Sequence, residues 1–185
     1  TEEFLHEKVL NGESAAIHVD DDILFYSYRT TPYLSAGGQV YLVAAKIVDD
    51  ELIIIEEMLI NDIPVIIPNT EQINTIAYEN GTIAIGVGKE VRWYEWTGTE
   101  FSYINSIYSD PLDMLGQISS GASIKNNLLY AVYKKYGLKI IDLSDGTEVA
   151  YYEGIGGHDE IDGFNVVEIG NDGKIYLSDF YQGVY

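Results

Sequence analysis

The stretch NTIAYENGTIAIGVGKEVRWYEWTGTEFSYINSIY, residues 74–108, decides the fold. It contains four short runs rich in β-branched and aromatic residues, separated by Gly, Asn and Thr, as expected for strands and turns. Asn80-Gly81 is a residue pair typical of a two-residue hairpin turn, because both positions tolerate positive φ. We predict one strand for each run, at 74–78, 82–87, 91–96 and 101–108.

The same pattern returns along the chain every 48 residues or so. Thr99-Glu100-Phe101 has counterparts in Glu2-Glu3-Phe4, Asp50-Glu51-Leu52 and Thr147-Glu148-Val149, so the last residues of these groups are 48, 49 and 48 apart. No stretch of 10–15 residues has a convincing helical period. A repeat of this length built from strands is typical of a propeller blade.

We therefore predict an all-β fold, a β-propeller of four blades with four antiparallel strands each. The N-terminal strand is expected to complete the last blade, because the chain begins in the phase of a fourth strand and the last blade stops at its third. Such closure removes exposed sheet edges. The predicted single domain covers 1–185, with blades at about 15–59, 73–108, 121–153, and 164–185 plus 2–10.

Two other arrangements fit the same repeat. The chain could be a fragment of a six- to eight-bladed ring, or half of a ring made by two chains. In an assembly of chains the open strands of the last blade would pair between chains. A homo-oligomer formed through those strands is therefore an alternative to the closed four-bladed ring.

Two segments resemble a known repeat family. Gly137-Leu138-Lys139-Ile140-Ile141-Asp142-Leu143-Ser144-Asp145 resembles the core of LVIVD-type β-propeller repeats. Lys174 to Phe180, followed by Gly183-Val184-Tyr185, is similar to the segment that precedes that core. The resemblance covers blades three and four well, blade two loosely and blade one poorly. It implies a propeller fold of the kind found in many secreted and cell-surface proteins, without a shared activity.

The net charge restricts the partners. Lys+Arg is 10 against Asp+Glu 30, a formal net charge of −20. A surface of this sign repels nucleic acid phosphates and anionic lipid head groups. No run of ~18 apolar residues is present, and the absence of cysteine excludes disulfides and thiolate metal sites. We expect no nucleic acid partner and no membrane insertion, whereas cationic and neutral partners remain open.

The acidity also suggests an environment. At about pH 2–4 most carboxylates are neutral and the self-repulsion disappears. With sixteen tyrosines and few basic residues, the composition suggests an extracellular or surface-exposed protein facing an acidic exterior, as in an acidophilic archaeon or its virus. A halophilic protein and an ordinary acidic soluble protein are the alternatives.

The best candidate site is the loop GIGGHDEIDG, residues 154–163, which holds one imidazole and three carboxylates between glycines. Oxygen-rich loops suit Ca²⁺, and a nearby His suits transition metals. Acidic loops are common on a chain of this charge, so a solvated loop is the first reading, and Asp159, Glu160 and Asp162 are the candidate metal ligands of the second. No other cofactor is expected.

A ligand-binding site is predicted beside that loop. Loops that share one face of a propeller, next to its central axis, are where sites usually lie. The residues expected to line it are Arg29, Tyr33, Lys134 and His158. Asp20-Asp21-Asp22 is expected first of all to form a hairpin turn, because Asp tolerates the backbone conformations that turns require.

No catalytic residue is predicted, because the chain contains no nucleophile elbow, no HExxH and no Ser/His/Asp order typical of a triad. We expect a non-enzymatic structural or interaction module that presents loops to a protein or glycan partner. The alternatives are a propeller enzyme with a polar central pocket, such as a lyase, lactonase or glycosidase, and a metal-stabilised scaffold.

Overall fold

The structure, a computed structural model, describes residues 13–30, 39–49, 51–60, 73–87, 90–108, 119–133, 137–152, 164–179 and 183–184. Among these residues all regular structure is β-strand, and no helix has the length and apolar character needed to cross a membrane. The N-terminal strand predicted at 2–10 lies outside the described residues.

The strands form four antiparallel sheets, each hydrogen-bonded in chain order. Sheet 1 contains β1 (Glu13–Asp20), β2 (Ile23–Arg29), β3 (Val40–Val48) and β4 (Glu51–Leu59). Sheet 2 contains β5 (Ile73–Glu79), β6 (Thr82–Val87), β7 (Glu90–Trp96) and β8 (Phe101–Tyr108). Sheet 3 contains β9 (Ser119–Lys125), β10 (Leu128–Tyr133), β11 (Gly137–Asp142) and β12 (Glu148–Tyr152). Sheet 4 contains β13 (Phe164–Ile169), β14 (Ile175–Asp179) and β15 (Gly183–Val184).

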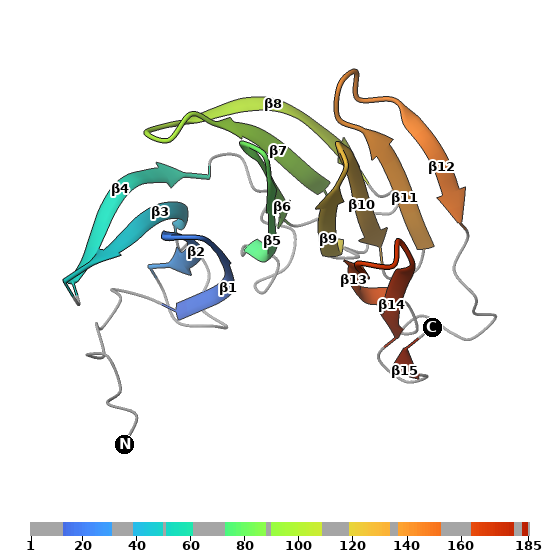
Figure 1. The fold of residues 1–185 in the computed structure, drawn as a ribbon, viewed down its shortest axis with the longest axis horizontal. Helices are drawn as coiled ribbons and strands as arrows, with labels where there is room; N and C mark the ends of the chain where they lie inside the picture. The colour runs from blue at the N-terminus through green and yellow to red at the C-terminus, as the bar shows by residue number, and fades with distance from the viewer. Residues whose placement is uncertain are drawn as a thin grey trace.

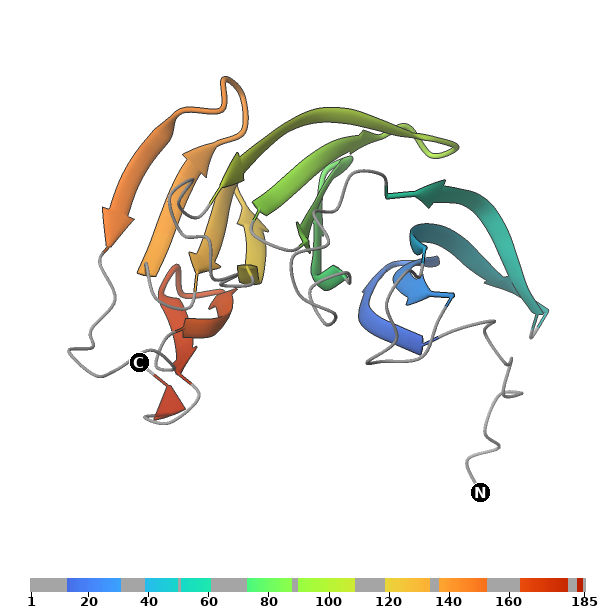
Figure 2. The ribbon, with the colours of Figure 1, turned by 180° about the vertical axis from the view of Figure 1, so that it is seen from behind.

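The sheets follow one another as the blades of a propeller, which confirms the predicted fold class. Their first strands β1, β5, β9 and β13 lie innermost, and each packs against the next in the series. Figures 1 and 2 show the four sheets along an open arc, with sheet 1 at one end and sheet 4 at the other. Within the described ranges, no packing of comparable extent joins these two end sheets.

Tight turns explain where the strands begin and end. Asn80 and Gly81 have φ values of 50° and 81°, and Asn126 and Asn127 have 53° and 63°, the left-handed pairs of a type I′ hairpin. Asn and Gly adopt this conformation more easily than other residues. The strands predicted on either side of Asn80-Gly81, at 74–78 and 82–87, are therefore found at 73–79 and 82–87.

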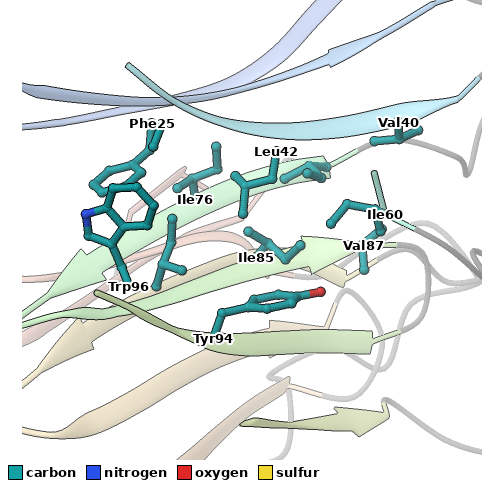
Figure 3. Close-up of a cluster of buried hydrophobic side chains, with 12 residues drawn as sticks. Phe25, Val40, Leu42, Ile60, Ile76, Ile85, Val87, Tyr94 and Trp96 are labelled. Atoms are coloured by element: carbon teal, nitrogen blue, oxygen red, sulfur yellow. The ribbon is translucent and has the colours of Figure 1, made fainter. Parts of the chain in front are cut away.

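The core lies between the sheets rather than inside any of them. One cluster between sheets 1 and 2 includes Phe25, Leu42, Ile85, Tyr94 and Trp96 (Figure 3). The ring of Phe25 meets the ring of Trp96 edge to face, with 5.7 Å between centroids, a geometry that aromatic pairs favour. The inner strands β5 and β9 therefore bury both of their faces, one against each neighbouring sheet.

Sheets 2 and 3 meet around Trp93, which is 1% exposed and packs with Ala122, Leu129 and Ala131. The alternation along β7 thus places Trp93 on one face and Tyr94 with Trp96 on the other, as the two-residue period predicts. Sheets 3 and 4 meet through Val132, Leu138, Ile140, Val167 and Ile169.

Hydrogen bonds also cross from sheet to sheet. The Tyr133 hydroxyl donates to the Ile107 carbonyl at 3.2 Å, and the Asn127 backbone N–H donates to the Glu79 carboxylate at 3.3 Å. The first of these gives a buried phenol the partner that burial demands. Burial also raises the pKa of Tyr133, with the charge of Glu90 adding to the shift.

Candidate binding surface

The ligand site predicted from sequence falls almost wholly outside the described residues. Tyr33, Lys134, His158 and the predicted metal ligands Asp159, Glu160 and Asp162 all lie there. Arg29 is described at the end of β2, where it is 3% exposed. The structure therefore places Arg29 in the interior, and the predicted ligand site stays a prediction.

The aspartates of the acidic hairpin at 20–22 serve to form the turn. Asp21 has a φ of 50°, and the Asp22 carboxylate forms an ion pair with Lys46 Nζ at 3.0 Å. Within the described part of the chain, no group of three His, Asp or Glu side chains is placed to hold a metal ion. Positive φ is tolerated by Asp better than by most residues.

Asp142 and Asp145 form local turn hydrogen bonds. The Asp142 carboxylate accepts from the Ser144 hydroxyl at 2.6 Å and from the Ser144 N–H at 2.8 Å. These two bonds lower the pKa of Asp142. The Asp145 carboxylate accepts from Thr147 in the same way, at 2.7 and 2.9 Å. These side chains are engaged in shaping turns.

A buried ion pair lies on β7. The Glu90 carboxylate accepts from Nε and Nη2 of Arg92, and the two side chains are 5% and 14% exposed. Burial disfavours the charged guanidinium, but the hydrogen bond and charge of Glu90, together with Tyr94, raise the pKa of Arg92. The pair thus keeps the guanidinium of Arg92 charged inside the protein.

His18 is the one histidine whose surroundings the structure describes. Its ring lies 6.3 Å from that of Tyr78, centroid to centroid. Burial lowers the pKa of His18, while the charges of Asp20 and Glu168 oppose the shift.

We expect His18 to titrate below about pH 6.5, the ordinary value for histidine. The unfolded chain then binds the proton more tightly than the folded chain does. The contribution of neutral His18 to the stability of the fold is therefore complete above about pH 6.5, and it is lost as the pH falls towards the pKa of His18 in the folded protein. NMR titration of the imidazole carbon protons would measure the midpoint, and His18→Gln would identify the signal. A midpoint above 6.5 would contradict the burial seen here.

The outermost strands carry the exposed hydrophobic residues that sequence reasoning missed. On β8, Tyr103 and Ile104 are 59% and 48% exposed, and on β12, Val149 and Tyr152 are 53% and 56% exposed. The Tyr103 ring packs edge to face on Tyr94, 5.7 Å between centroids. Its hydroxyl donates to Ser106 Oγ at 3.2 Å. These residues form the outer rim of the propeller.

Bulges explain part of this exposure. The register of β8 against β7 skips Ile104, and the register of β12 against β11 skips Val149. A bulge re-aims side chains and increases strand twist. The signal was present in the sequence as a break in the period-two alternation, but its position depends on pairing with the neighbouring strand.

The backbone edge of β8 is also exposed to pairing. β8 is last in the order of its sheet, and its sequence FSYINSIY contains no charged residue. Natural edge strands usually carry charges, prolines or a covering segment that blocks pairing with another chain. β4, by contrast, carries Glu51, Glu56 and Glu57. Among the described outer strands, β8 is therefore the one best suited to receive a partner.

Comparisons with known proteins bear on the fold. No protein-family model matches the chain, and no curated protein does, so the LVIVD-type resemblance remains a prediction. The chain is similar to the crystal structure of the computationally designed Ika4 protein, with a TM-score of 0.64 and 8% identity over 100% of this chain and 96% of that chain. At this identity the likeness concerns the fold alone.

Proposed function

We propose that this protein is a non-enzymatic interaction module, an extracellular or particle-surface β-propeller that presents its rim and loops to a protein or glycan partner. The observation that carries the proposal is the uncharged outer strand β8, with Tyr103 and Ile104 exposed on it. Exposed aromatic residues provide a large contact area at low entropic cost.

Two kinds of contact are available at this rim. The free edge of β8 can add an extended segment of a partner by main-chain hydrogen bonds, with side chains such as Tyr103 setting specificity. The tyrosines can also stack against the apolar face of a sugar ring. The net charge of −20 favours neutral or cationic partners in both cases.

The proposal can be tested with an array of neutral, cationic and anionic glycans together with basic and acidic peptides. We expect the wild-type protein to bind neutral or basic ligands and Ile104→Lys to lose at least about 10-fold in affinity, because a charge on an edge strand blocks its use. Val48→Lys is the matched control, since Val48 is also exposed (45%) but lies on β3, which is paired with a strand on each side.

Two outcomes would contradict the proposal. Binding restricted to anionic ligands would contradict the charge argument. Cleavage of an array ligand, rather than its retention, would favour the alternative of a propeller enzyme. Loss of binding in Val48→Lys but not in Ile104→Lys would move the binding surface away from the rim.

A further inference from the structure

The two ends of the arc leave sheet faces unpartnered among the described residues. We call the face towards the next sheet along the chain the forward face, and the opposite one the rear face. Each of sheets 2, 3 and 4 packs its rear face on the sheet before it. In the described ranges, nothing comparable packs on the rear face of sheet 1 or on the forward face of sheet 4.

The rear face of sheet 1 has the apolar character of a buried interface. Ile17 lies on the first strand of its sheet and pairs with Tyr26 on the second. The equivalent pairs in the other three sheets are Ile76 with Ile85, Ala122 with Ala131, and Val167 with Leu177. The three counterparts of Ile17 on β5, β9 and β13 are 2–8% exposed, whereas Ile17 is 66% exposed. Val19, two residues further along β1 and on the same face, is 64% exposed.

The centre of this face is already shielded within the chain, so its exposed part lies on the innermost strand. Tyr26, Val43 and Ala45 form a buried cluster there, and the rings of Tyr28 and Tyr41 stack with centroids 4.9 Å apart. Ile17 and Val19 continue the cluster onto the innermost strand, where sheets pack most closely against their neighbours. Repeat residues that are buried in three copies and exposed in the fourth indicate a missing neighbour.

The forward face of sheet 4 likewise exposes apolar residues whose equivalents in the other sheets are buried. Val184 lies on the third strand of its sheet and pairs with Ser178 on the second. The equivalent pairs in the other three sheets are Leu42 with Ser27, Val91 with Gly86, and Leu138 with Val132. Leu42, Val91 and Leu138 are at most 2% exposed, whereas Val184 is 70% exposed. Val166 and Tyr176, on the same face, are 55% and 40% exposed.

We propose that the forward face of sheet 4 packs on the rear face of sheet 1 in a second copy of this chain. The contact continues the sheet-to-sheet interface that the chain repeats within itself. It is a head-to-tail contact, which gives a closed ring only if the rotation per copy completes a circle. Two copies of four sheets make eight, the upper end of the usual propeller range, whereas three copies would make twelve.

The proposal concerns apolar faces and not the open strands of the last blade. It also predicts a salt dependence. Because each copy carries −20, like-charge repulsion opposes the contact, and salt weakens that repulsion. Association should therefore strengthen as the salt rises from about 0.01 to about 0.15 M, the opposite of an interface held by ion pairs.

Light scattering coupled to size-exclusion chromatography tests the proposal on the whole chain. We expect a particle of twice the chain mass of 20.7 kDa. Ile17→Lys and Val184→Lys should each weaken association on the order of 100-fold, because a charge is buried at the centre of the contact. Ile104→Lys, an equal charge change on the rim, should leave it unchanged, and circular dichroism would check that each variant is folded.

Mixing the two variants is the sharper test. An Ile17→Lys chain keeps its forward face and a Val184→Lys chain keeps its rear face, so one intact contact can form between them. The mixture should therefore recover double-mass particles that neither variant forms alone. A wild-type chain that stays monomeric at about 100 μM would overturn the proposal. Dissociation by Ile17→Lys but not by Val184→Lys would also overturn it, because that result indicates a dimer in which two rear faces meet. Ligand binding on the array would be unaffected by that result.

Discussion

Trp93→Ala is expected to lower the free energy of unfolding by about 4 kcal/mol, within the range measured for large aromatic residues in cores. Trp93 is 1% exposed and fills the space between sheets 2 and 3, against Ala122, Leu129 and Ala131. These small neighbours cannot expand into the vacated volume, so a cavity remains. For a chain of this size the loss corresponds to a fall in melting temperature of about 8–16 °C.

Trp93→Phe separates volume from polarity at the same position. In the part of the chain that the structure describes, the indole N–H of Trp93 has no hydrogen-bond partner, and such a buried donor is itself unfavourable by about 1–3 kcal/mol. Removing it offsets part of the lost packing, so Trp93→Phe should lose no more than about half as much stability as Trp93→Ala. Urea denaturation would compare the two with Tyr103→Ala, an exposed aromatic control. A loss in Trp93→Ala no larger than in that control would contradict the position of Trp93 between two sheets.

Glu90→Leu is expected to lower the free energy of unfolding by about 3–5 kcal/mol, as when one member of a buried ion pair is removed. The Glu90 side chain is 5% exposed and the Arg92 side chain 14%. Without Glu90 the guanidinium of Arg92 stays in the interior and loses the carboxylate that supports its charge. Water cannot replace that carboxylate at so low an exposure.

The double variant Glu90→Leu/Arg92→Met shows whether the effect comes from the orphaned charge. Replacing both members of a buried pair by apolar residues is often neutral or stabilising. We expect the double variant to recover most of the stability lost in Glu90→Leu, at an unchanged denaturant slope. A double variant less stable than the single would mean that other partners of Glu90 carry the effect. Lys46→Ala breaks an exposed pair with Asp22 and should change stability by no more than about 1 kcal/mol.

The strand and turn positions were predictable because they depend on local chemistry. Asn80-Gly81 and Asn126-Asn127 reverse the chain by adopting positive φ, which these residues tolerate without long-range help. The alternation of Trp93, Tyr94 and Trp96 likewise predicts opposite faces from the strand period alone.

The candidate site was less predictable, because it depends on contacts between distant segments. Of the residues expected to line a ligand site, only Arg29 is described, buried at the end of β2. The rim on β8 was missed, because Ile104 is exposed by a bulge that exists only in the register with β7. Sequence patterns show that residues alternate, and they do not show where a ladder slips by one residue.

By itself, the sequence determined a four-fold strand repeat of about 48 residues, its hairpin turns and a surface charge of −20, since these follow from local propensity and composition. Only the tertiary structure decided which apolar residues are covered. Ile17 and Ile76 occupy equivalent places in the repeat, yet one is 66% exposed and the other 6%. The difference arises because burial depends on whether another sheet packs on that face, and a residue's own chemistry cannot specify its neighbour.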